Sequence, residues 1–128
     1  MAHCTKRILI VEDNKLDARL LNDILKSRGY ETLHAIDGSE AINLTFADGP
    51  DLILMDVRLP GISGLEVTHR LKGDARSRGI PIVAVTACAM GWHEREALDS
   101  GCDAYISKPI SILGFLNTVE SFLSRFPH

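Results

Sequence analysis

Short apolar runs alternate with longer amphipathic stretches along nearly the whole chain. Each run has the length and composition of a buried strand, and the third, with its Leu-Ile-Leu-Met sequence, is typical of a strand covered on both faces of a parallel sheet. Five strands are therefore predicted. They cover Arg7 to Glu12, Glu31 to Ala35, Asp51 to Asp56, Pro81 to Thr86 and Ala104 to Ser107.

The stretches between the strands, and the one after the last strand, predict helices. A weaker helix covers Ser39 to Ala47. Helices are also predicted from the capping-box pair Ser63 and Glu66 to about Lys72, and from about Met90 to Ser100. A first helix is capped by Asn14 and ends at Gly29. One face of it is expected to carry Leu16, Leu20, Leu21, Ile24 and Leu25. The last helix has the clearest apolar stripe, made by Ile112, Phe115, Leu116, Val119, Phe122 and Leu123.

Regular alternation of strands and helices predicts an α/β fold with a parallel sheet, right-handed crossovers and helices on both faces. We choose the doubly wound (βα)₅ arrangement with strand order 2-1-3-4-5, although periodicity alone does not give the order. No repeat, low-complexity tract or linker interrupts the 128 residues. We therefore expect a single domain over residues 1–128, with its core at about 6–125 and no output domain.

Composition excludes several classes of function. The formal charge is -3, and the 14 basic and 17 acidic residues are mixed, so no basic stripe favours direct binding of nucleic acid. Cys4, Cys88 and Cys102 are odd in number and lack metal-ligand spacing, which favours a reducing, cytoplasmic setting. The apolar run Ile8 to Val11 is too short for a signal peptide or a membrane span.

Charged residues follow three of the predicted strands. Glu12 and Asp13 follow the first, Asp56 ends the third, and Lys108 follows the fifth. The carboxyl ends of parallel strands form one edge of a sheet, so these side chains are expected to converge. Singly, each has a simpler interpretation, such as acids that favour the start of a helix. Together they predict a site where crowded carboxylates repel one another unless a divalent cation neutralises them.

An ordered set of motifs gives a more specific interpretation. The set comprises VEDN at 11–14, LMDVRLP at 54–60, VTA at 85–87 and YISKP at 105–109. In this order the motifs resemble the receiver domain of bacterial two-component response regulators, from Lys6 to about Arg125. Further motifs are similar to a subgroup of single-domain regulators of cell division and polar development. These are GYETL at 29–33, ISGLEVT at 62–68, VAVTA at 83–87 and AYISKPIS at 104–111.

The resemblance implies a CheY-like, flavodoxin-like fold and a phosphoacceptor. Asp56 is expected to accept a phosphoryl group from a phosphohistidine on a histidine kinase or a histidine phosphotransfer protein. Mg²⁺, with Mn²⁺ as a substitute, is expected to bind Glu12, Asp13, Asp56 and the backbone carbonyl of Arg58. The resemblance therefore implies a signalling phosphoacceptor and not an enzyme. Such a protein catalyses only its own phosphorylation and dephosphorylation.

The same resemblance implies roles for residues around the phosphoacceptor. Lys108 and the hydroxyl of Thr86 are expected to bind phosphoryl oxygens, while the small Ala87 leaves room for the group to enter. Thr86 and Tyr105 form the switch pair. The bond before Pro109 is expected to be cis, which aims Lys108 inward. Without the resemblance, Tyr105 is equally consistent with a half-buried aromatic residue.

Output is expected from a surface built by the fourth helix, the fifth strand and the last helix. Trp92 and His93 are candidates for exposure there, and a monomer or weak dimer is expected.

Two other classes of protein remain open as interpretations of the sequence. A haloacid-dehalogenase-type phosphatase needs a second acid where Arg58 stands, and a flavodoxin-like carrier needs a phosphate-binding loop where residues 12–14 read Glu-Asp-Asn. A degenerate receiver would lack one of the acids.

Overall fold

The computed structural model describes residues 5–86 and 91–125, with the side chains of Thr86, residues 91–94 and Arg125 outside this description. Within that part of the chain, five strands and five helices alternate. The strands are β1 (Arg7–Val11), β2 (Glu31–Ala35), β3 (Leu52–Asp56), β4 (Ile82–Thr86) and β5 (Ala104–Ser107). The helices are α1 (Lys15–Lys26), α2 (Gly38–Asp48), α3 (Gly64–Lys72), α4 (Gly91–Asp99) and α5 (Ile112–Arg125).

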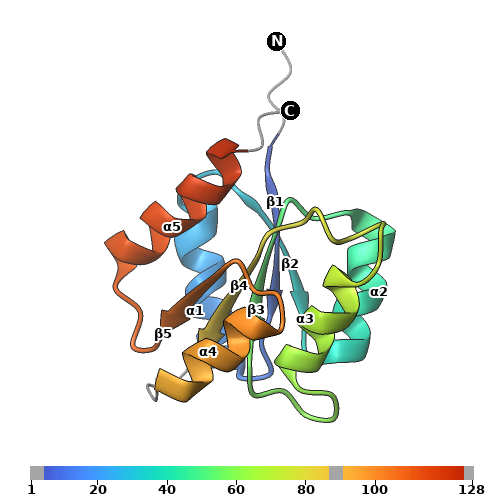
Figure 1. Ribbon diagram of the computed structural model, residues 1–128. Coiled ribbons are helices and arrows are strands. Elements are labelled where there is room, and N and C mark those ends of the chain that lie inside the picture. Colours follow the sequence, from blue (N-terminus) through green and yellow to red (C-terminus); the bar gives the residue numbers. More distant parts are fainter. Residues whose placement is uncertain (1–4, 87–90, 126–128) are drawn as a thin grey trace.

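The strands form one parallel sheet in the order β2-β1-β3-β4-β5, which confirms the predicted doubly wound fold (Figure 1). The register aligns the strand ends: Val11 pairs with Met55, and Asp56 pairs with Val85. Because all strands run the same way, the residues that follow β1, β3 and β5 lie along one edge of the sheet. None of the helices in the described residues is long and apolar enough to cross a membrane.

Two hydrophobic cores cover the two faces of the sheet. On one face, alternate residues of the central strands pack against α1 and α5, with Phe115 1% exposed at the centre. On the other face, the intervening residues pack against α2, α3 and α4. Figure 1 shows α1 and α5 together on one side of the sheet and α2 with α3 on the other. Burial on both faces explains why β3 reads as a continuous apolar run.

Two details of the predicted helices are wrong. Leu16 and Leu20 do not belong to the buried face of α1, since they are 80% and 49% exposed, and Ala18 is buried instead. In an α-helix, Leu16 lies nearly opposite Leu25, so a list of leucines overstated the apolar face. Ile112 is 53% exposed because it opens α5 before the stripe reaches the core. Element ends shift by a residue or two, and Met90 lies outside the described residues.

Candidate functional site

Three carboxylates meet at the carboxyl edge of the sheet. Glu12 and Asp13 follow β1 and Asp56 ends β3, and one carboxylate oxygen from each lies within 4.8 Å of the others. Glu12 is 2% exposed and Asp56 is 7% exposed, whereas Asp13 lies at the surface. The predicted convergence of these acids is therefore present, and it places two nearly buried carboxylates beside a solvent-accessible one.

Local hydrogen bonds fix the two buried acids. The Glu12 amide donates to the Ala35 carbonyl at 3.0 Å, and the ring Nε2 of His34 lies 2.8 Å from the Glu12 carbonyl oxygen. The Glu12 carboxylate also accepts a hydrogen bond from the amide of Asn14 at 3.1 Å. Asp56 accepts one from the Arg58 amide at 2.9 Å through Oδ1. Because neighbouring backbone holds these acids, neither depends on a flexible loop for its position.

Gly64 allows α3 to begin directly against the end of β3. A Cβ atom at this position would lie 2.0 Å from the backbone oxygen of Asp56, so no larger residue fits unless the backbone moves. The Gly64 amide donates to the Val57 carbonyl at 3.0 Å, and the Ser63 hydroxyl caps the helix by accepting from the Glu66 amide. The predicted cap is confirmed, and this close approach holds the chain after Asp56 against the sheet.

Lys108 brings an ammonium group to the acids from the end of β5. Its Nζ donates to Glu12 Oε1 at 2.7 Å and to Asp17 Oδ2 at 3.0 Å, and it lies 3.8 Å from Asp56 Oδ2. The bond between Lys108 and Pro109 is cis, as expected. The Lys108 side chain thus contacts two acids that lie 96 and 91 residues away in the sequence.

The electrostatics of the site differ sharply from those of isolated side chains. Burial, followed by the close approach of Glu12, raises the pKa of Asp56 from 3.8 to about 7, against the opposing effects of the Arg58 amide and Lys108. Burial works to lower the pKa of Lys108, but its bonds to Glu12 and Asp17 and the charge of Asp56 raise it overall. The lysine is therefore a fixed cation, and Asp56 carries a charge that its surroundings do not fully compensate.

This donor set fits a small divalent cation. Hard cations such as Mg²⁺ take oxygen ligands, commonly one or two carboxylates together with water and phosphate oxygens. Glu12, Asp13 and Asp56 supply oxygens alone, and the high pKa of Asp56 reports negative charge that a cation would stabilise. All four predicted ligands, including the Arg58 carbonyl, remain predictions.

Other predicted residues are only partly placed. The side chain of Thr86 and all of Ala87 lie outside the described residues, as do Cys88 and the side chains of Trp92 and His93. Tyr105 is partly buried and packs against the core that faces α2, α3 and α4. Its position agrees with either interpretation made from the sequence, so its switch role remains a prediction.

Sequence reasoning missed three residues that shape the site. Asp17 shares Lys108 with Glu12, His34 contacts the Glu12 carbonyl, and Gly64 admits α3. A signal for Asp17 was present, because the first turn of the helix after β1 begins at the same sheet edge. The other two depend on tertiary contacts that no local pattern encodes.

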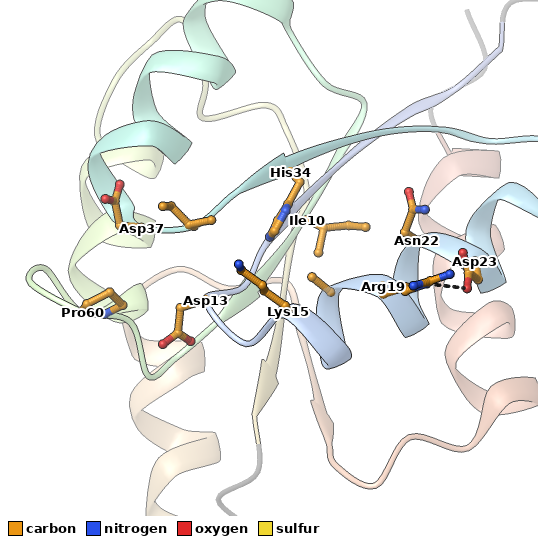
Figure 2. Close-up of a pocket in the computed structure, with 11 residues that line it drawn as sticks. Ile10, Asp13, Lys15, Arg19, Asn22, Asp23, His34, Asp37 and Pro60 are labelled. Carbon is orange, nitrogen blue, oxygen red and sulfur yellow. Dashed lines mark ion pairs between the residues drawn. The ribbon is translucent and has the colours of Figure 1, made fainter.

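A separate pocket of about 790 Å³ lies beside the acids, between α1 and the end of β2 (Figure 2). In Figure 2, Asp13 lies between Pro60 and Lys15, with Asp37 above Pro60 and His34 above Lys15. The pocket shares Asp13 with the acid site, but Glu12, Asp56 and Lys108 do not line it. The acid site and this pocket are therefore distinct features of the molecule.

Comparisons with known proteins agree with this geometry. The family model of the response regulator receiver domain matches residues 8–120. The chain therefore belongs to the response regulator receiver domain family, whose members are signalling phosphoacceptors. It is also a homologue of the polar-differentiation response regulator DivK of Brucella ovis, with 50% identity over 119 residues that cover 93% of this chain and 97% of the relative.

Two solved structures are similar throughout. The receiver domain of the sensor histidine kinase PA1611 from Pseudomonas aeruginosa, with a magnesium ion coordinated in its active-site cleft, is 29% identical with a TM-score of 0.88, covering 94% of this chain and 99% of that one. A CheY-like receiver domain protein from Methanospirillum hungatei is 29% identical with a TM-score of 0.87, covering 94% and 95%. The fold is thus CheY-like, and the family excludes the phosphatase and flavin-carrier alternatives.

Proposed function

We propose that Asp56 accepts a phosphoryl group from a phosphohistidine, in a reaction that needs Mg²⁺, and that phosphorylation changes the binding of a partner protein. The observation that carries this proposal is the convergence of Glu12, Asp13 and Lys108 around the carboxylate of Asp56. Asp56 is nearly buried, yet it lies at the strand edge where a phosphoryl donor can approach. The magnesium ion in the Pseudomonas aeruginosa receiver supports the choice of metal.

The residues divide the chemistry among them. A Mg²⁺ ion held by Glu12, Asp13, Asp56 and the Arg58 carbonyl would stabilise the negative charge that develops on the phosphoryl oxygens, and Mn²⁺ suits the same oxygen ligands. Lys108 keeps its proton and stabilises further charge, with the Thr86 hydroxyl as a donor and Ala87 leaving the entry open. Asp56 attacks phosphorus in line, and the donor's leaving group keeps the electrons of the broken P–O or P–N bond.

Signalling then depends on surfaces of the domain itself. The proposed output surface comprises α4, β5 and α5, where Leu98, Ile112 and Leu113 are 46%, 53% and 70% exposed. A rearrangement of Thr86 and Tyr105 would link Asp56 to this surface. The name of the Brucella ovis relative, a polar-differentiation response regulator, supports a role in division or polarity control, and we propose that the protein acts in the cytoplasm. The phosphoryl donor is a histidine kinase or histidine phosphotransfer protein, and we propose a monomer or weak dimer.

The proposal is tested by incubation with Mg²⁺ and acetyl phosphate, followed by intact-mass measurement. The unaltered protein should gain the mass of one phosphoryl group, and chelation of Mg²⁺ should abolish the gain. Asp56→Asn should gain nothing. Asp51→Asn is the matched control. Asp51 lies just before the first residue of β3, at the end of the strand away from Asp56, and it accepts a hydrogen bond from the Arg7 amide. A mass gain that persists in Asp56→Asn would contradict the assignment.

A further inference from the structure

The ammonium of Lys108 is shared unequally among its acidic neighbours. Its two hydrogen bonds go to Glu12 at 2.7 Å and to Asp17 at 3.0 Å. Asp56 Oδ2 is 3.8 Å away, which is beyond hydrogen-bond distance. The lysine that should serve the phosphoacceptor is thus drawn toward α1, and two carboxylates hold it there.

Asp17 differs from the other acids in position and in partner. It lies in the first turn of α1, where the Asn14 cap accepts from its amide, and its side chain is 42% exposed. In the described residues it does not belong to the carboxylate cluster formed by Glu12, Asp13 and Asp56. Within the described residues, its carboxylate forms an ion pair with Lys108. A role in metal binding therefore does not explain Asp17, whereas a role in holding the lysine does.

Phosphorylation demands the opposite arrangement. A phosphoryl group adds nearly two negative charges at Asp56, and a close bond from Lys108 to that group competes with the hydrogen bond from Lys108 to Asp17. The charge on Asp17 also repels an anionic donor that approaches this edge of the sheet. We propose that Asp17 is a positioning residue that holds Lys108 away from Asp56 and so slows phosphorylation, an inference that rests on the proposed function.

Asp17 is proposed to affect the transfer of a phosphoryl group from acetyl phosphate to Asp56. A carboxylate oxygen of Asp56 forms a bond to the phosphorus of acetyl phosphate, while the bond from phosphorus to the acetyl oxygen breaks. Acetate leaves with the electron pair of that bond, and no proton is transferred. Asp17 changes only the position of the ammonium group and the charge around it.

The first test compares phosphorylation rates of Asp17→Asn and the unaltered protein, with Mg²⁺ and acetyl phosphate at saturating metal. Loss of one partly exposed ion pair should raise the rate about two- to tenfold, and the difference should shrink in high salt because ions screen exposed charges. The control is Asp23→Asn, which removes the same charge from α1 at a residue that Figure 2 shows paired with Arg19. Asp23→Asn should leave the rate unchanged.

A second measurement follows Lys108 directly, without metal or donor. The ¹⁵Nζ signal of its ammonium, assigned by its absence in Lys108→Ala, should shift in Asp17→Asn and stay in place in Asp23→Asn. An equal or lower rate in Asp17→Asn, or a ¹⁵Nζ signal that does not respond to it, would overturn the proposal. Phosphorylation that is absent in every variant, or that survives Asp56→Asn, would instead overturn the proposed function together with this inference.

Discussion

Two partly buried lysines anchor opposite ends of the sheet, and their surroundings differ. Lys72, the last residue of α3, donates to Asp103 at 2.8 Å, to the Ile80 carbonyl at 2.8 Å and to the Arg78 carbonyl at 3.3 Å. Asp103 also accepts a hydrogen bond from the Ile82 amide, where β4 begins. One lysine and one carboxylate thus join α3 to the amino ends of β4 and β5.

Lys108 meets an excess of acid instead. Glu12, Asp17 and Asp56 lie within ion-pair distance of its ammonium, and Asp13 completes the cluster with two of them. Charge is balanced around Lys72 and unbalanced around Lys108. A balanced centre stabilises one structure, whereas an unbalanced one costs stability until a further cation binds. The comparison teaches that surplus charge, rather than burial of a charge, distinguishes the functional end of this sheet.

The largest expected effect concerns the backbone beside Asp56, at the acidic end of the sheet where Glu12, Asp13 and Asp56 meet. Gly64→Ala should lower the free energy of unfolding by about 3 kcal/mol, because its Cβ would overlap backbone atoms that cannot move away cheaply. The measurement is urea unfolding followed by circular dichroism. Gly79→Ala is the control, since nothing lies within 4 Å of a Cβ there, and its effect should stay within about 0.5 kcal/mol. Equal stability of the two variants would show that the approach of α3 to Asp56 is not rigid.

The second prediction tests the surplus of charge. In metal-free protein at neutral pH, Asp56→Asn should raise the free energy of unfolding by about 2 kcal/mol, because the amide removes a charge that burial and Glu12 disfavour. Urea unfolding with a chelator present measures this change. Saturating Mg²⁺ should stabilise the unaltered protein and reduce the difference. A variant that is less stable without metal would contradict the idea that the acidic end costs stability.

The sequence was sufficient for the strands and, once the doubly wound order had been chosen, for the convergence of the acids. Periodicity located each strand, and the parallel order then required Glu12, Asp56 and Lys108 to share one edge. These predictions succeeded because they depend on chain direction and on burial along whole strands, which local patterns encode well.

The failures concern single side chains. Leu16 is solvent-exposed although it is a leucine, because its direction depends on helix phase rather than on residue type. The contact between Asp17 and Lys108 spans 91 residues, and nothing local specifies which carboxylate a lysine selects. The requirement for Gly64 arises only where α3 meets β3, so no pattern in the sequence around it indicates the close contact.

The third prediction concerns Lys72 and Asp103, whose charges balance each other. Lys72→Met keeps the apolar stem but leaves Asp103 and two carbonyls without the ammonium, so the free energy of unfolding should fall by about 1.5 kcal/mol. Lys26→Met, at an exposed position in α1, should change it by less than about 0.5 kcal/mol. Thermal and urea unfolding of both variants provide the comparison. A stabilising effect of Lys72→Met would mean that the ion pair between Lys72 and Asp103 also lowers the stability of the fold.

The smallest change per measured step is the dependence of stability on pH, because the effect of Asp56 is spread over about three pH units. The pKa of Asp56 is about 7 in the folded protein and near 3.8 when unfolded, so between these values the folded state binds more protons. This group therefore makes the free energy of unfolding fall as pH rises from about 4 to 7, by less than about 1.4 kcal/mol per pH unit.

The effect of Asp56 is isolated as the difference between the unaltered protein and Asp56→Asn, measured by urea unfolding without metal at several pH values. The stability advantage of Asp56→Asn should be small near pH 4, grow through pH 7 and then level off. Lys72→Met, compared in the same way, should show no such growth, because this variant and the unaltered protein both keep Asp56. If the advantage of Asp56→Asn is independent of pH, the cost at the acidic end arises from packing and not from charge.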